Sequence, residues 1–294
     1  MPTVYFIAEG GLANNLFQYF AAELMRKMYG YDEVKLTFQI NLEFNLVIDD
    51  AKWKTICTRY QEGNPVPLDT TRNILMMGFF QRSEPFEADR EYLRSLFTID
   101  NLHYINRTVQ IKNIVSYQTK HTVVPGPTDL TMHIRCGDFL DQKSLLFPTS
   151  SVLSSQLTDP SSLIELIRSI PHTTLYLVHD TLKEDWEKHY VAQFDCLNPV
   201  AIHGNMADDF DFLMKSHTLL LSASTFSWMA AFLGNATQVH IPYHSHYGGI
   251  EGTGQSLAGF HEGCKVYYSM DTWPTSQGMP ANPAPSAAEE KETA

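Results

Sequence analysis

Apolar positions along most of this chain follow two periods, one typical of strands and one typical of helices. The apolar run from Val4 to Ala8 predicts a strand, and a helical pattern follows from about Asn14 to Tyr29. In that helix Leu16, Phe20 and Leu24 recur at four-residue steps and form an apolar stripe. A glycine pair separates the two patterns. The chain therefore opens with a strand, a glycine turn and a helix, which is typical of the first unit of an α/β fold.

The pattern is less regular between residues 34 and 125. A strand is predicted at Asn73 to Phe80, and a helix from about Pro85 to Phe97. The cluster Pro125-Gly126-Pro127 is the strongest candidate for a boundary between two halves, because proline and glycine interrupt regular structure.

After this boundary, strand and helix patterns alternate with short connections. We predict strands at about 129–135, 174–179, 199–203, 218–222 and 239–243, and helices at about 161–169, 184–194, 208–217 and 226–233. Such alternation indicates a parallel sheet with helices on both faces.

The predicted organisation has two α/β halves, 1–125 and 126–274, followed by a tail, 275–294. The tail holds three prolines and five alanines, and Met279 is its only apolar residue larger than alanine. It cannot bury enough apolar surface to offset the entropy lost on ordering, so we expect it to be disordered.

The overall charge narrows the classes of function. Asp and Glu number 33 against 21 Lys and Arg, which gives a net charge of −12. A general nucleic-acid binder needs a basic face, so this class is a poor match. No segment approaches the roughly 20 apolar residues of a membrane helix, and the N-terminal segment does not match a signal peptide. The four cysteines, Cys57, Cys136, Cys196 and Cys264, lack metal-ligand spacing and suggest free thiols. We expect a soluble, cytoplasmic protein.

Three segments stand where a strand gives way to a turn or a helix. The first is Gly10 to Asn14, where glycine lets a ligand approach the backbone and the helix N-terminus offers free N–H groups to an anion. The segment matches neither GxGxxG nor the P-loop. A tight turn and a phosphate cradle both fit it.

The second segment is His133-Ile134-Arg135-Cys136-Gly137-Asp138. Alternation along a strand places His133 and Arg135 on one face at its carboxyl end, where α/β folds bind ligands. The planar guanidinium of Arg135 is suited to clamping a diphosphate. A structural pair between Arg135 and Asp138 is the alternative.

The third segment is Ser222 to Trp228, whose hydroxyl groups can cap the following helix or hold phosphate oxygens. A further candidate is Asp209-Phe210-Asp211, which mimics the DxD of metal-dependent nucleotide-sugar enzymes. Phe210 begins a helical apolar pattern that continues through Leu213, so we place both aspartates in the first turn of a helix.

Taken in chain order, these segments resemble the α1,2-fucosyltransferases of glycosyltransferase family 11. The family's GGLGNQMFQY is similar to GGLANNLFQY at Gly10 to Tyr19, and its GYFQSEKYF-like block is similar to GFFQRSEPF at Gly78 to Phe86. Its VHIRRGDY resembles MHIRCGDF at Met132 to Phe139, and its SNSSFSWWAAWL resembles SASTFSWMAAFL at Ser222 to Leu233. A DF-x-LM helix before the last block is similar to DFLM at Asp211 to Met214, which lacks the intervening residue.

The resemblance implies a GT-B fold, in which two Rossmann-like halves enclose a cleft, with 1–125 as the acceptor-side half and 126–274 as the GDP-fucose-binding half. It also implies GDP-fucose as donor, a sugar hydroxyl as acceptor, inversion to an α1,2-linked fucoside on galactose, and no metal or other cofactor. The chain departs from the family pattern at Ala13, Asn15, Cys136 and Met229. The second arginine of HxRRGD is missing at Cys136, which removes one positive charge next to the expected phosphate site. The acceptor glycan and the oligomeric state do not follow from the resemblance.

The resemblance further implies roles for single residues. Arg135 would stabilise charge on the leaving diphosphate, with His133 and Asp138 as orienting groups at the reaction centre. Donor binding would involve Gly10, Gly11, Asn14, Gln18, Asp180, Ser224, Thr225, Phe226 and Ser227, with Asp180 at the guanosine. No residue identifies itself as the general base.

Two other functions remain open from the sequence. A carbohydrate-binding protein of the same fold would keep the cleft and turn nothing over, and Cys136 is the feature that favours it. A metal-dependent glycosyltransferase would use Asp209 and Asp211 as ligands.

Overall fold

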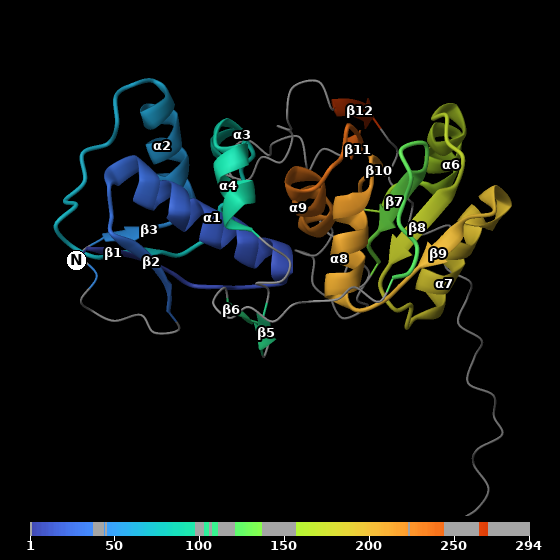
Figure 1. Cartoon of the computed structure of the whole chain (residues 1–294), viewed down its shortest axis with the longest axis horizontal. Coiled ribbons are helices and arrows are strands. Elements are labelled where there is room, and N and C mark those ends of the chain that lie inside the picture. The colour runs from blue at the N-terminus through green and yellow to red at the C-terminus, as the bar shows by residue number, and fades with distance from the viewer. Residues whose placement is uncertain are drawn as a thin grey trace, which may run out of the picture.

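Parallel β-sheets carry the fold, one in each half of the chain, and helices pack around them (Figure 1). The structure is a computed structural model, and it describes residues 2–37, 44, 46–97, 103–105, 108–110, 121–136, 157–222, 224–243 and 265–269. Asp138 and the predicted tail at 275–294 lie outside these residues.

The N-terminal half contains a parallel sheet in the order β2-β1-β4-β3. Its strands are β1 (Thr3–Phe6), β2 (Glu33–Leu36), β3 (Leu46–Ile48) and β4 (Ile74–Met76). Its helices are α1 (Leu12–Tyr29), α2 (Asp50–Gln61), α3 (Glu84–Ala88) and α4 (Arg90–Leu96), and an antiparallel pair, β5 (His103–Ile105) and β6 (Thr108–Gln110), follows. The chain adds β2 on one side of β1 and then adds β3 and β4 on the other side. The direction in which strands are added therefore reverses beside β1.

The C-terminal half contains a six-stranded parallel sheet in the order β12-β11-β10-β7-β8-β9. Its strands are β7 (Leu130–Ile134), β8 (Leu175–His179), β9 (Val200–Ile202), β10 (Thr218–Leu220), β11 (Gln238–Tyr243) and β12 (Lys265–Ser269). Its helices are α6 (Pro160–Ser169), α7 (Asp185–Ala192), which continues into a 3₁₀ turn (Gln193–Leu197), α8 (Met206–Lys215) and α9 (Thr225–Leu233). This strand order is that of a dinucleotide-binding Rossmann sheet. The direction in which the chain adds strands reverses between β7 and β10.

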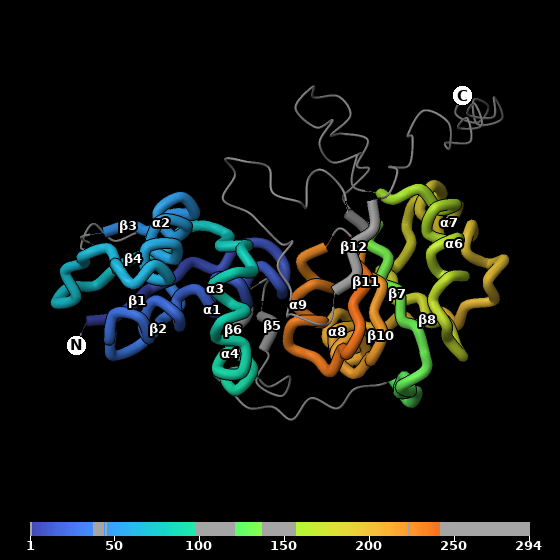
Figure 2. The backbone as a smooth tube through the Cα atoms, turned by 90° about the horizontal axis from the view of Figure 1, so that it is seen from above, coloured from blue at the N-terminus to red at the C-terminus, as the bar shows by residue number. Residues whose placement is uncertain are grey.

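Strand β7 separates two layers of helices, as Figure 2 shows. Ile134 belongs to an apolar cluster with α6 and α7. On the opposite face, Thr131 Oγ1 accepts a hydrogen bond of 2.9 Å from Ser216 Oγ at the end of α8, and the ring of His133 lies 5.5 Å from that of Phe226 on α9. Side chains of β7 therefore alternate between the two layers, as expected for a buried parallel strand.

The two halves meet where α1 and α4 pack against α9. The rings of Phe17 and Trp228 lie 5.1 Å apart across this contact and belong to one apolar cluster that includes residues of both halves. Arg90 Nε donates a hydrogen bond of 2.7 Å to the carbonyl of Phe232 near the end of α9. Two Rossmann-like halves thus pack together in the GT-B arrangement, with helices between their sheets (Figure 1).

The observed elements differ from the predicted ones mainly before residue 125. The predicted helix from Pro85 to Phe97 is divided into α3 and α4 at Asp89, whose φ and ψ of −116° and 20° are not helical. Strands β2, β3, β5, β6 and β12 and helix α2 were not predicted, and the strand predicted at Asn73 to Phe80 ends at Met76. The predicted boundary at 125–127 lies between β6 and β7. No helix in the described part of the chain is both long enough and apolar enough to cross a membrane.

Candidate functional site

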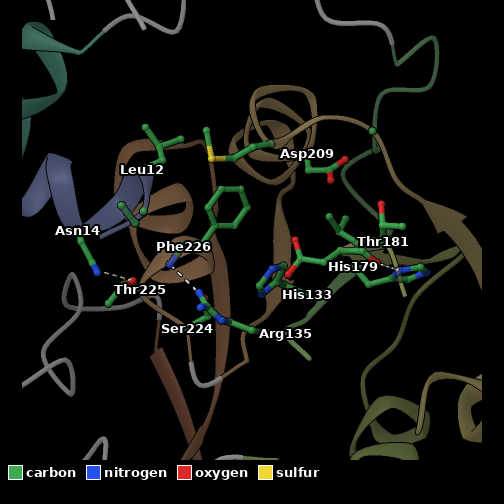
Figure 3. Close-up of a pocket in the computed structure, with 16 residues that line it drawn as sticks. Leu12, Asn14, His133, Arg135, His179, Thr181, Asp209, Ser224, Thr225 and Phe226 are labelled. Atoms are coloured by element: carbon green, nitrogen blue, oxygen red, sulfur yellow. Dashed lines mark hydrogen bonds between the residues drawn. The ribbon is translucent and has the colours of Figure 1, made fainter. Parts of the chain in front are cut away.

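A pocket of about 340 Å³ lies between the two halves (Figure 3). It is lined by Gly11, Leu12, Ala13 and Asn14 of the N-terminal half and by His133, Arg135, Val178, His179, Asp180, Thr181, Gly204, Met206, Asp209, Ser224, Thr225 and Phe226 of the C-terminal half. These residues follow the carboxyl ends of strands β1, β7, β8, β9 and β10. The pocket therefore lies where the strand order reverses in both sheets, which is where open α/β sheets bind ligands.

One end of the pocket is formed by two helix N-termini from different halves. Gly11 is the N-cap residue of α1, and Ser224 is the N-cap residue of α9. They are linked across the pocket, because Thr225 Oγ1 donates a hydrogen bond of 3.0 Å to Asn14 Oδ1. The first-turn N–H groups and the positive ends of two helix dipoles favour an anion at this end, although the Phe226 amide of α9 already donates to Ser224 Oγ at 3.2 Å.

The glycine turn before α1 is held by the side chain of Asn15, a departure from the family pattern for which the sequence predicts no role. Asn15 is buried, and its Nδ2 lies 3.1, 3.3 and 2.9 Å from the carbonyl oxygens of Glu9, Gly10 and Gly11. Gly10 has a φ of +80°, a conformation that glycine adopts without strain. The turn is therefore fixed before any ligand binds.

Arg135 and His133 both line the pocket, as the alternation along β7 predicts. His133 is only 4% exposed, and its Nδ1 lies 2.6 Å from Ser222 Oγ. Burial, together with the neighbouring Arg135 and His179, lowers the pKa of His133 to about 3. His133 is consequently a neutral hydrogen-bonding group at neutral pH rather than a proton acceptor.

The lowered pKa of His133 makes the fold sensitive to acid. The unfolded chain takes up a proton at this histidine below a pKa of about 6.5, while the folded chain stays unprotonated down to about 3. Stability is therefore lost as the pH falls below 6.5, by about 2 kcal/mol from this group between pH 7 and pH 5. Urea unfolding measures the free energy of unfolding at both pH values. Between pH 7 and pH 5 it should fall by about 2 kcal/mol less in His133→Gln than in the wild type. Equal losses in the two proteins would mean that folded His133 binds a proton.

Cys136 occupies the position of the second arginine in the family pattern, and it does not line the pocket. The side chain is 1% exposed in the apolar cluster formed by β7, α6 and α7. Burial, with Glu187 and Asp180 nearby, raises the pKa of the Cys136 thiol to about 12, so the thiol is un-ionised and inert. The sequence predicts that the missing positive charge lies next to the phosphate site. Alternation along the strand instead directs this position to the other side of the sheet.

Carboxylates gather on the wall opposite the two helix N-termini. Asp180 follows β8, and Asp209 lies in the first turn of α8, as predicted, but it also lines the pocket. His121 Nε2 lies 3.1 Å from Asp209 Oδ1, and the His121 ring packs on Phe212 at 5.6 Å. Burial raises the pKa of Asp209, although His121 acts in the opposite direction. The orientation of α8 about its axis, which no sequence pattern gives, brings Asp209 to the pocket.

The other aspartate of the DxD segment, Asp211, points elsewhere, and it lies beyond the first turn of α8, so its predicted place in the first turn is wrong. Lys215 Nζ donates a hydrogen bond of 2.6 Å to Asp211 Oδ2 within α8, and Asp211 is absent from the pocket lining. Residues two apart on a helix face nearly opposite directions, so Asp209 and Asp211 do not converge. Within the described ranges, no three His, Cys, Asp or Glu side chains are grouped as they would be around a metal ion.

Most of the predicted site residues meet in this pocket. Those that line it are Gly11, Asn14, His133, Arg135, Asp180, Ser224, Thr225 and Phe226. Gly10, Gln18 and Ser227 do not line it. The side chains of Gln18 and Ser227 are fully buried. Gln18 accepts a hydrogen bond from the Glu9 amide at 2.9 Å and donates one of 3.1 Å to the Gly78 carbonyl, so it joins two loops. Ser227 Oγ donates to the Ser224 carbonyl inside α9.

Solved structures provide the comparisons for this chain, since no protein-family model and no curated protein matches it. It is similar to the bacterial iron-containing dodecameric glycosyltransferase TibC from enterotoxigenic E. coli H10407, with 10% identity over 91% of this chain and 63% of TibC, at a TM-score of 0.41. It is also similar to POFUT1 in complex with GDP-fucose, with 6% identity over 91% of this chain and 97% of POFUT1, at a TM-score of 0.39. The chain thus spans less than two thirds of the length of TibC.

Proposed function

We propose that this protein is an inverting fucosyltransferase that moves L-fucose from GDP-fucose to a sugar hydroxyl, forming an α1,2 linkage to galactose. The observation that carries the proposal is the convergence of Arg135 with the N-termini of α1 and α9 in one pocket. The four sequence blocks shared with α1,2-fucosyltransferases add the donor and the linkage. Gly11, Arg135 and Ser224 lie in three different blocks of those four.

The diphosphate of the donor would occupy the end of the pocket between the two helices. The N–H groups of α1 and α9 and the guanidinium of Arg135 supply donors and positive charge there. Asn14 adds an amide that bridges the two halves through Thr225. This set of groups suits an anion with several oxygen acceptors.

The guanine base would lie against the opposite wall. Guanine presents two adjacent N–H donors, N1–H and N2–H, and a carboxylate accepts such a pair. Asp180 and Asp209 are the carboxylates of that wall. Because burial raises the pKa of Asp209, its ionised form gains from any N–H donor that reaches it.

The reaction breaks the bond between fucose C1 and a phosphate oxygen. The electron pair of that bond leaves with GDP, while the acceptor oxygen bonds to C1 from the opposite face and releases its proton to solvent. Positive charge develops on the sugar ring and negative charge on the diphosphate. In this scheme Arg135 lies nearest the growing negative charge, and neutral His133 orients groups beside it.

A GDP-release assay with GDP-fucose tests the proposal. We expect slow release with water as acceptor and much faster release when a β-galactoside is added, with the product identified by its linkage. Tight binding of GDP without release would instead favour a carbohydrate-binding protein of the same fold. No binding of GDP or GDP-fucose would overturn the proposal.

We expect turnover to survive EDTA. The charge of the diphosphate is met in this proposal by Arg135 and helix N-termini, and the DxD aspartates are engaged separately, Asp209 by His121 and Asp211 by Lys215. The same release assay, run with and without chelator, measures the effect. Complete loss on chelation, restored by manganese or magnesium, would show that the phosphate charge is met by a cation instead.

A further inference from the structure

A loop outside the pocket reaches one of the residues that line it. Residues 78–81, which we call the 78–81 loop, follow β4, and none of them belongs to the pocket wall. Gln81 Nε2 nevertheless donates a hydrogen bond of 2.9 Å to Asn14 Oδ1. We propose that Gln81 is a positioning residue, which fixes the Asn14 amide so that its N–H groups, rather than its oxygen, face the diphosphate. The inference rests on the proposed function.

The 78–81 loop is held in one conformation by a carboxylate from α2. Asp50 Oδ1 accepts a hydrogen bond of 2.6 Å from the Phe80 amide, and Oδ2 accepts one of 3.2 Å from the Phe79 amide. A Cβ at position 78 would lie 2.7 Å from Asp50 Oδ2, so any larger residue there would displace this carboxylate. The backbone that carries Gln81 is therefore fixed by its hydrogen bonds to Asp50 on α2.

Phe80 gives the loop its direction. Its φ of +53° is left-handed, a conformation rare in residues with a side chain. The Phe80 side chain is fully buried, with its ring 6.1 Å from that of Trp53 on α2. Burial and the two bonds to Asp50 hold this uncommon conformation, which aims the next residue, Gln81, at Asn14.

The bonds at Asn14 determine which way its amide faces. Oδ1 accepts two hydrogen bonds, one from Gln81 Nε2 and one from Thr225 Oγ1. An amide oxygen has two lone pairs, so both are used. The donating Nδ2 then lies beside the glycine turn, where a Cβ on Gly10 would approach it to 2.5 Å. Asn14 therefore presents donors, not an acceptor, at the anion end of the pocket.

Two substitutions of Gln81 should have graded effects. Gln81→Leu removes the donor and lets the Asn14 amide rotate. Gln81→Glu replaces the donor with a carboxylate that attracts Asn14 Nδ2, so the amide turns and directs its oxygen at the diphosphate. We expect GDP to bind about threefold to tenfold more weakly to Gln81→Leu and still more weakly to Gln81→Glu.

A double-mutant cycle with Asn14→Ala tests whether Gln81 acts through Asn14. The dissociation constant of GDP is measured by calorimetry for the wild type, Asn14→Ala, Gln81→Leu and the double variant. We expect Gln81→Leu to weaken GDP binding in the wild type and to have no further effect in Asn14→Ala. The matched control is Gln61→Leu, because Gln61 is an exposed glutamine at the end of α2. This variant should bind GDP like the wild type.

Thermal unfolding of the same preparations shows whether weaker GDP binding comes from a change at Asn14 or from partial unfolding. We expect the melting temperature of Gln81→Glu to stay near that of Gln81→Leu. Equal loss of GDP affinity from Gln81→Leu in both backgrounds, or no loss in either, would overturn the role of Gln81 alone. If Asn14→Ala and Arg135→Ala both bind GDP like the wild type, the proposed donor site itself is wrong.

Discussion

Arg135→Ala should fold normally and turn over GDP-fucose about 10² to 10³ times more slowly than the wild type, with a smaller loss of GDP affinity. In the proposed reaction, negative charge grows on the diphosphate as the bond to fucose C1 breaks. An interaction that is stronger in the transition state than in the ground state contributes to kcat more than to binding. Arg135 lines the pocket beside the N-termini of α1 and α9. Steady-state kinetics and GDP calorimetry on the same preparation measure both quantities.

A second consequence of Arg135→Ala does not depend on activity. Arg135 is one of the causes that lower the pKa of His133, after burial and before His179. Removing the guanidinium should therefore raise the pKa of His133, which an NMR titration of the imidazole measures. An unchanged His133 pKa would place the guanidinium farther from His133 than the structure does.

Arg135→Lys is the matched control for charge without geometry. Lysine keeps the positive charge and loses the planar fork that bonds two phosphate oxygens, so we expect only partial recovery of kcat. A structural pair between Arg135 and Asp138 makes a different prediction, because Arg135→Ala and Asp138→Asn would then both fold poorly. If Arg135→Ala is folded and turns over GDP-fucose at close to the wild-type rate, Arg135 does not clamp the diphosphate.

The C-terminal sheet was predictable because its strands are short apolar runs separated by amphipathic helices. Strands β7 to β11 and helices α6 to α9 all lie within or close to their predicted ranges. Helix α2 was missed because it buries only Trp53, Ile56 and Cys57 and is otherwise polar. Those three residues keep the spacing i, i+3, i+4, and Asp49 caps the helix by accepting from the Lys52 amide, so a weak local signal was present.

The candidate site was predictable in its segments and not in the direction of single side chains. Twelve of the 18 residues of α1 are buried, because the helix packs against its own sheet and against α9. Gln18 is therefore enclosed although it belongs to a motif at the pocket, and only the packing of both halves reveals this. His121 was missed for the opposite reason. It lies in no regular element, and its partner Asp209 is 88 positions away along the chain.

Gly10→Ala should weaken GDP binding by about tenfold or more and should also destabilise the fold. The φ of Gly10 is +80°, and an added Cβ would lie 2.5 Å from Asn14 Nδ2. Left-handed backbone costs about 1–2 kcal/mol in a residue with a Cβ, so the melting temperature should fall by a few degrees. The collision would also displace the Asn14 amide from Thr225 and from the anion end of the pocket.

Two glycine controls separate these effects of Gly10→Ala. Gly63 has a similar φ of +70°, but a Cβ there would meet no atom within 4 Å, so Gly63→Ala should lose similar stability and keep the GDP affinity of the wild type. Gly11 has an ordinary φ of −83°, and a Cβ there also meets no atom within 4 Å, so Gly11→Ala should keep its melting temperature. Thermal unfolding and GDP calorimetry on the three variants give both readouts. If Gly10→Ala binds GDP as tightly as Gly63→Ala does, the Asn14 amide does not contact the diphosphate, because the same strain would then have no consequence at the pocket.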